Sequence, residues 1–198
     1  MDPADAEGHA DPADDPSVRV ASIPTPRLTL ESMSVPFMRA LARGDHAGAE
    51  RAIGAAIPDD MPANLAHFLE YRLGQLEADP TIRHWLARAM VLTGPDGTRR
   101  VIGTIGFHGP PDEQGRLEVG YRIEPEYRRR GYTREAVRAM FDWAAAEHDV
   151  HSFVASIRPD NAPSLGLAAG FGFVQVGTQI DDIDGLELVF ETTWPAPA

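Results

Sequence analysis

The spacing of apolar residues divides most of the chain into short strands and helices. Alternating or continuous apolar runs predict strands over 27–31, 85–93, 99–107, 117–123, 153–157, 173–181 and 186–193. Helical spacing predicts helices over 35–42, 63–77, 131–147 and 162–169. Glycine-containing turns over 94–97 and 109–115 join successive strands as hairpins.

The order of these elements predicts the fold class. Hairpins give antiparallel neighbours, whereas a helix between two apolar strands is typical of a crossover that joins parallel neighbours. The helix over 131–147 stands in that position, between strands 117–123 and 153–157. We therefore expect a single α/β domain with a mixed, mostly antiparallel sheet, flanking helices and one central βαβ unit.

The first 24 residues show no such pattern. Six acidic residues lie there among Pro, Ala and Gly, and Arg19 is the single base. Because the segment offers little apolar surface to bury, we expect a disordered acidic tail over 1–24, with an interaction segment as the alternative. The domain is then expected over 25–198.

Composition excludes several kinds of chemistry. The 198 residues include no Cys, and all 18 basic residues are Arg. Thiol nucleophiles, Cys-ligated metals, Schiff-base lysines and a P-loop lysine are therefore excluded, and we expect no metal site. A net charge of −12 argues against broad nucleic-acid binding. With no apolar segment suited to a membrane or a secretion signal, we expect a cytoplasmic protein without a membrane partner.

Three consecutive arginines and a glycine separate strand 117–123 from the long amphipathic helix. A helix start presents unpartnered backbone N–H groups and the positive end of the helix dipole, and glycine lets an anion approach the backbone closely. In an acidic chain, Arg128, Arg129, Arg130 and Gly131 therefore predict a pyrophosphate pocket. A solvated run of charges before a helix is the alternative.

Together with Tyr132 and Thr133, this segment resembles the Gln/Arg-x-x-Gly-x-Gly/Ala pyrophosphate loop of the GCN5-related N-acetyltransferases, the GNAT family. The preceding residues 117–127 are similar to the family's fourth strand, and 156–173 resemble its second cofactor motif, an Asn-x-x-Ser helix that closes on Gly-Phe. The start of the domain, Thr25-Pro26-Arg27-Leu28, looks like that of the RimJ and RimL branch, which acetylates ribosomal-protein N-termini. The similarity spans about 24–194.

The resemblance implies a GNAT-like fold with acetyl-CoA as cosubstrate. Its pantetheine arm would lie like a strand between strands 117–123 and 153–157, paired with backbone groups of Ile123, Glu124 and Pro125. Asn161 would hydrogen-bond the pantetheine, and Ser164 would lie near the thioester sulfur. Backbone N–H groups of the loop would hold the pyrophosphate, from Arg128, Arg129, Arg130, Gly131, Tyr132 and Thr133.

Two positions depart from the family pattern. The last small residue of the loop is Thr133, whose hydroxyl could meet a phosphate oxygen. The tyrosine that commonly protonates the leaving thiolate is replaced by Ala168, which leaves Ser164 to act directly or through water. Candidate bases are Glu118, acting through water, and His108 at the end of a strand. Both could equally be ordinary surface residues, and Asn161 could be only a helix cap.

The resulting hypothesis is an acetyl-CoA-dependent N-acetyltransferase. It would transfer acetyl directly to a primary amine, either a protein N-terminus or a small cationic molecule, since an acyl-cysteine intermediate is excluded. Acidic residues over 112–113 and 181–184 would suit a cationic acceptor if they border the cleft. A homodimer is left open by the resemblance. The competing hypothesis is an acyl-CoA-binding sensor or scaffold with weak catalysis, because the usual tyrosine is missing.

Overall fold

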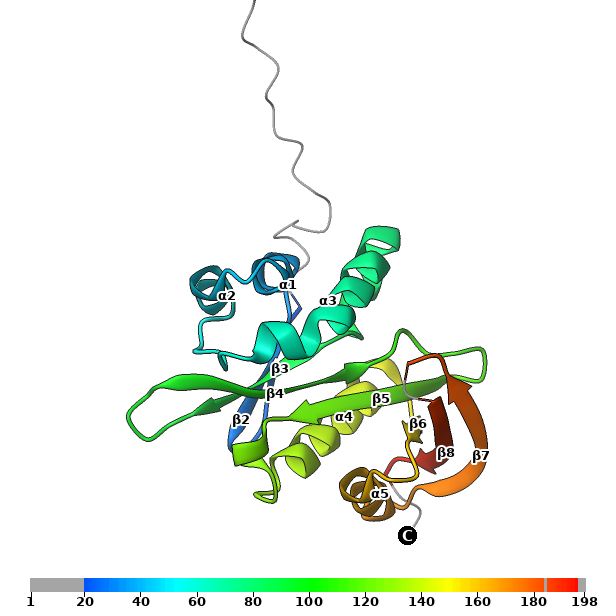
Figure 1. The fold of residues 1–198 in the computed structure, drawn as a ribbon. Coiled ribbons are helices and arrows are strands. Elements are labelled where there is room, and N and C mark those ends of the chain that lie inside the picture. Colours follow the sequence, from blue (N-terminus) through cyan, green and yellow to red (C-terminus); the bar gives the residue numbers. More distant parts are fainter. Residues whose placement is uncertain (1–19, 184, 196–198) are drawn as a thin grey trace, which may run out of the picture.

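One eight-stranded sheet with helices on both faces forms the core of the computed structural model, which describes residues 20–183 and 185–195 (Figure 1). The order of the strands across the sheet is β1-β2-β3-β4-β5-β6-β8-β7. Their bounds are β1 Ile23–Pro24, β2 Leu28–Ser32, β3 Arg88–Thr93, β4 Arg99–Phe107, β5 Arg116–Ile123, β6 Ser152–Ile157, β7 Val174–Asp181 and β8 Gly185–Thr193.

The four predicted helices are confirmed. The α-helices are α1 Val35–Ala42, α2 His46–Ile53, α3 Met61–Ala78, α4 Tyr132–His148 and α5 Ala162–Ala169, and 3₁₀ turns lie at Pro80–His84 and Pro125–Tyr127. The sequence did not predict α2, because only Ala49 and Ile53 of this short helix are buried. Its termini carry local signals, since the Asp45 side chain accepts from Gly48 N–H and Gly54 ends it in the left-handed region.

The strand pairing confirms the mixed, mostly antiparallel sheet. Each neighbouring pair is antiparallel except β5 and β6, which run parallel and are joined by α4 as the central βαβ unit. The predicted strand over 85–93 begins later, at Arg88, because Trp85 closes the 3₁₀ turn of Pro80–His84.

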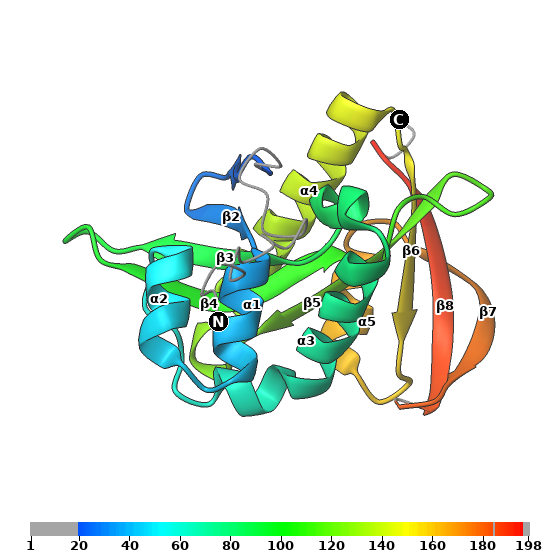
Figure 2. The same cartoon turned by 90° about the horizontal axis from the view of Figure 1, so that it is seen from above.

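Two apolar layers hold the helices on opposite faces of the sheet (Figures 1 and 2). On one face the apolar stripe of α4 is buried, and Phe141 stacks on Phe153 of β6 with ring centroids 3.8 Å apart. On the other face α1 and α3 bury Phe37, Leu41 and Leu69 against β3 and β4. The sheet therefore lies between two layers of helices, and its central strands are buried on both faces.

The ordered sheet begins slightly before the expected domain start. Ile23 is buried and pairs with Leu30 of β2, so the last residues of the predicted tail belong to the fold. The rest of that tail, residues 1–19, lies outside the described residues. Among the described helices, none has the length and apolar character needed to cross a membrane.

Candidate functional site

Strands β5 and β6 are paired only at one end. Their parallel pairs run from Arg116 with Ser152 to Glu118 with Val154 in the described residues. On its other edge, β5 stays paired with β4 through Ile123; Glu118 O accepts from His108 N–H just after β4, and Glu124 N–H donates to Ile102 O of β4. Because bonding alternates along a strand, the backbone groups of Tyr121 and Ile123 point to the β6 side beyond the last paired residues, into an open gap.

This alternation corrects one predicted contact. The Glu124 N–H donates to Ile102 O at 2.9 Å, and the Glu124 carbonyl accepts from Tyr127 N–H within the 3₁₀ turn. Pro125 has no N–H. The backbone groups of Glu124 are therefore occupied within the protein, whereas Tyr121 and Ile123 present backbone groups to the gap. The Glu124 side chain is buried, which raises the pKa of its carboxyl above the ordinary value.

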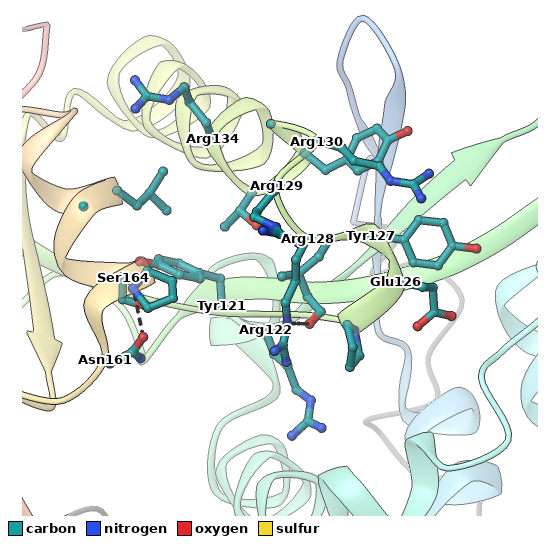
Figure 3. A pocket seen from close by; sticks show the side chains of 18 residues that line it. Tyr121, Arg122, Glu126, Tyr127, Arg128, Arg129, Arg130, Arg134, Asn161 and Ser164 are labelled. Atoms are coloured by element: carbon teal, nitrogen blue, oxygen red, sulfur yellow. Dashed lines mark hydrogen bonds between the residues drawn. The ribbon is translucent and has the colours of Figure 1, made fainter.

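A cavity of about 1290 Å³ opens between the end of β5, the start of α4 and the start of α5 (Figure 3). Ten of the predicted cofactor residues line it, drawn from all three elements. They are Ile123, Pro125, Arg128, Arg129, Arg130, Gly131, Tyr132, Thr133, Asn161 and Ser164. Residues 40 positions apart in sequence thus meet around one space large enough for an extended ligand.

The loop before α4 is bent so that backbone N–H groups can converge on an anion. Arg129 and Gly131 both lie in the left-handed region, with φ of 59° and 81°. Gly131 is the N-cap residue of α4, and in the described residues no side chain caps that helix start. The first N–H groups of α4 therefore remain available, and conformations of this kind form anion-binding concavities.

Arginines give the cavity a strong local positive charge. Besides Arg128, Arg129 and Arg130, the side chains of Arg122 and Arg134 line it, against the single carboxylate of Glu126. Arg128 Nε donates to Ile123 O at 3.4 Å, which joins the loop to the end of β5. Five guanidinium groups beside an uncapped helix start form a site suited to phosphate groups.

A contact that the sequence did not predict ties the loop to the start of the domain. Glu135 of α4 accepts from Arg27 Nε at 2.6 Å, from Arg27 N–H at 2.7 Å and from Thr25 Oγ1 at 2.6 Å. Arg27 Nη1 also donates to Arg130 O at 3.0 Å, and its guanidinium lies 4.4 Å from the centre of the Tyr132 ring. We call Thr25, Arg27 and Glu135 the loop clamp.

The first turn of α5 forms the opposite wall of the cavity. The Asn161 side chain accepts from Ser164 N–H at 3.2 Å, so Asn161 is the N-cap of α5 as well as a lining residue. Tyr121 on β5, a lining residue that the sequence did not single out, lies beside Ser164 in the cavity (Figure 3). Ala168, at the position of the family's tyrosine, is buried in the core.

Glu118 and His108, the candidate bases, do not line this cavity. They form a pair, with His108 Nδ1 3.5 Å from Glu118 Oε2. Burial raises the pKa of Glu118, but hydrogen bonds from His108 and Ser156 outweigh it and leave the pKa below its ordinary value. Gln179 Nε2 joins this polar group, donating to Ser156 Oγ at 3.0 Å. The pair lies where the gap closes, because Glu118 is the last residue of β5 that pairs with β6.

In the part of the chain that the structure describes, no group of three or more His, Asp or Glu side chains could hold a metal ion. Among the described residues, the arginine-lined cavity and the Glu118–His108 pair hold most of the predicted site residues.

Comparisons with known proteins agree with this geometry. The family model described as the acetyltransferase (GNAT) domain matches residues 27–174. The uncharacterized N-acetyltransferase YjdG of Bacillus subtilis (strain 168) is 29% identical over 157 residues, which cover 76% of this chain and 88% of YjdG. Two solved structures share the fold. RimJ of Mycobacterium smegmatis, in complex with CoA-disulfide, has a TM-score of 0.59, 17% identity and 88% coverage of both chains. The ribosomal-protein-S5-alanine acetyltransferase of Vibrio fischeri has a TM-score of 0.56 and 19% identity, covering 87% of this chain and 96% of its own.

Proposed function

This chain belongs to the GNAT acetyltransferase domain family and is an acyltransferase; from that premise we propose that it transfers acetyl from acetyl-CoA directly to a primary amine. One observation carries the proposal: a one-sided gap in the sheet opens into an arginine-lined cavity at an uncapped helix start. Acetyl-CoA suits both features, because its pyrophosphate matches the arginine-lined cavity and its extended, amide-containing arm matches the gap between β5 and β6.

The fit assigns each part of the donor to particular residues. Its pyrophosphate would bind the N–H groups of the loop over 128–133, aided by the arginine side chains. Its arm would pair with the gap-facing backbone of Ile123 and Tyr121. The arm cannot pass the point where β5 and β6 pair, so the thioester would stop near Val119 and Glu118.

The Glu118–His108 pair supports amine chemistry at that point. An amine is mostly an ammonium ion at neutral pH and must lose a proton before it attacks the thioester. Glu118 is ionised at neutral pH, because its pKa lies below the ordinary value. It would attract the ammonium and receive the proton through water, held in place by His108. The chain has no Cys, which excludes an acyl-cysteine intermediate and favours direct transfer.

Charge around the closed end of the gap supports a cationic acceptor. The negative charge of Asp181 interacts with that of Glu118. Gln179 Nε2 donates to Ser156 Oγ and also, at 2.9 Å, to the carboxylate of Glu187. Asp112, which the sequence predicts as a possible contact for a cationic acceptor, instead accepts hydrogen bonds from Arg116 Nε and from the backbone N–H groups of Gln114 and Arg116. Asp184 lies outside the described residues. A peptide N-terminus and a small diamine both carry the required charge.

The test supplies acetyl-CoA and a panel of primary amines, including peptide N-termini and small diamines. Release of CoA is followed with a thiol reagent, which reacts only with CoA because the protein has no Cys. We expect release to depend on the amine and an acetylated product to appear by mass spectrometry. An Arg130→Glu, Gly131→Asp double variant should lose donor binding in calorimetry, whereas Arg51→Glu on α2 should bind normally.

Three results are distinguishable. Amine-dependent release supports the proposal. Donor binding to the wild type without consumption by any amine would contradict it and favour the sensor or scaffold alternative, which the loss of the family tyrosine at Ala168 suggests. Absence of donor binding to the wild type would refute both.

A further inference from the structure

Helix α3 contacts the Glu118–His108 pair from the face of the sheet opposite α4 (Figure 2). Arg72 Nη1 and Gln75 Nε2 of this helix both donate to His108 O, each at 3.0 Å. Arg72 Nη1 also donates to Gln75 Oε1 at 2.8 Å, so the two side chains act as one unit. The backbone of His108 is therefore anchored to a helix that lies far from it in sequence.

Strand β5 fixes the other side of His108. The His108 N–H donates to Glu118 O at 2.9 Å, and its ring Nδ1 lies 3.5 Å from Glu118 Oε2. A Cβ atom on Gly120 would lie 2.8 Å from His108 Nε2. Because residues two apart point to the same face of a strand, the ring lies along β5, over Gly120 and beside Glu118. A side chain at position 120 would displace the ring.

Arg72 is a buried charge without a counter-ion. It is 4% exposed, and its Nε has no hydrogen-bond partner among the described residues. None of the groups that shift its pKa is a carboxylate, and burial lowers the pKa of its guanidinium below the ordinary value. Burying an unpaired charge is costly, and an apolar side chain of similar length would fill the space beside Phe68 without that cost. Packing alone therefore does not account for Arg72, whereas its contact with His108 does.

We propose, on the basis of the proposed function, that Arg72 is a positioning residue that holds His108 against Glu118, the carboxylate that receives the proton of the amine. Arg72 and Gln75 fix the backbone of His108, and the close contact with Gly120 restricts its ring. A protonated ring nitrogen directed at a carboxylate favours the ionised form of that carboxylate. Arg72 thus acts on Glu118 through His108, without contact with the acceptor or the donor.

The other groups around Glu118 act in both directions. Burial raises the pKa of its carboxyl, as does the negative charge of Asp181, whereas His108 and Ser156 lower it and prevail. The carboxylate of Glu187 is reached from Ser156 only through the side chain of Gln179. Loss of the His108 contact should therefore raise the pKa of Glu118, and this pKa reports the position of the ring.

The Glu118 carboxyl can be titrated directly by carbon-13 NMR, with its signal assigned by Glu118→Gln. The variants that loosen His108 are Arg72→Met, Gln75→Leu and Gly120→Ala. Each is compared with wild type, both alone and in a His108→Ala background. Arg51→Met on α2 is the matched control, because it removes an exposed guanidinium away from the pair.

We expect Arg72→Met and Gly120→Ala to raise the pKa of Glu118 by about one pH unit, as for loss of a contact with an ionised group. Gln75→Leu should raise it less, because Arg72 remains. In the His108→Ala background none of them should have a further effect, and Arg51→Met should have none in either background. With an acceptor, Arg72→Met should lower kcat about tenfold while KM for acetyl-CoA stays within about twofold.

An unchanged Glu118 pKa in Arg72→Met overturns the inference. So does a rise that persists in the His108→Ala background, since Arg72 would then act on Glu118 by its charge and not through the ring. Thermal unfolding verifies that each variant is folded. Gln75 is half-buried, so Gln75→Leu tests the same anchor if Arg72→Met does not fold, and an unchanged pKa there then overturns the inference.

The titration needs neither acetyl-CoA nor an acceptor, so its failure is distinguishable from failure of the proposed function. If the Glu118 pKa responds as expected in a protein that acetylates no amine, the geometry of the pair is supported and the proposed function alone is refuted.

Discussion

At the scale of single residues, the loop clamp links the start of the domain to the arginine loop over 128–131. Glu135 is well shielded, with 12% of its side chain exposed, and it accepts three hydrogen bonds from Thr25 and Arg27. Burial alone would raise the pKa of Glu135, but these bonds outweigh it and hold the pKa below its ordinary value. The ionised carboxylate of Glu135 therefore holds Arg27 in place, where Arg27 Nη1 donates to Arg130 O.

Glu135→Gln should destabilise the fold by about 1–2 kcal/mol near neutral pH, because the charged acceptor is lost. The pKa of Glu135 is lower in the folded state than in the unfolded state, so its ionisation stabilises the fold. This stabilisation is fully present above the unfolded-state pKa, about 4.3, and is lost as the pH falls through the folded-state pKa. The difference from wild type should therefore shrink in acid, as measured by urea unfolding across pH. Glu147→Gln, exposed on the same helix, is the control. A difference that persists below the folded-state pKa would contradict this account.

At the scale of elements, a close approach between β4 and β5 positions the gap. The register between β3 and β4 shifts between Met90 and Val91, opposite the segment that contains Gly103. A Cβ atom on Gly103 would lie 2.3 Å from Arg122 O and 3.0 Å from Ile123 Cα. The end of β5 can therefore lie where it does only because residue 103 has no side chain.

Gly103→Ala should push the end of β5 away and destabilise the protein by about 1–3 kcal/mol, the usual cost of overpacking. The melting temperature should fall by several degrees, and affinity for acetyl-CoA should fall with it, because Ile123 lines the cavity. Gly109→Ala is the matched control, since a Cβ there meets nothing within 4 Å. Equal melting temperatures for the two variants would refute the close-approach argument.

At the scale of the whole molecule, the charge of the chain and the charge of the cavity have opposite signs. The chain carries 30 acidic residues against 18 arginines, a net charge of −12, yet five of those arginines line one cavity. The surrounding negative surface repels anions elsewhere and leaves this cavity as a local site of positive charge.

Added salt should weaken acetyl-CoA binding, because it screens the phosphate groups from the arginines. Acetylpantetheine, which has the same reactive arm without phosphates, should bind more weakly than acetyl-CoA and show little salt dependence. Calorimetry at low and high salt measures both ligands. An equal salt dependence for the two would mean that the arginines do not carry phosphate recognition.

Features encoded in contiguous residues were predicted well. The bounds of α1, β4 and α5 match the expectation, because clear apolar spacing defines each of them and N-caps at Ser34 and Asn161 mark the two helix starts. The arginine loop was also predicted, since its charges, its glycine and the helix it precedes are neighbours in sequence. Helix α2 was missed because it buries too little apolar surface to produce a periodic signal.

The sequence by itself thus determined most of the elements, the order that makes β5 and β6 parallel, and the place of the arginine loop before α4. The tertiary structure decided which distant groups meet. Thr25 and Glu135 are 110 residues apart, and Tyr121 of β5 and Ser164 of α5 line the same cavity. It also decided which backbone groups of β5 face the gap, because that depends on the register with β4. Local spacing records the conformation of a segment, whereas such contacts depend on how the packed sheet and helices place segments beside one another.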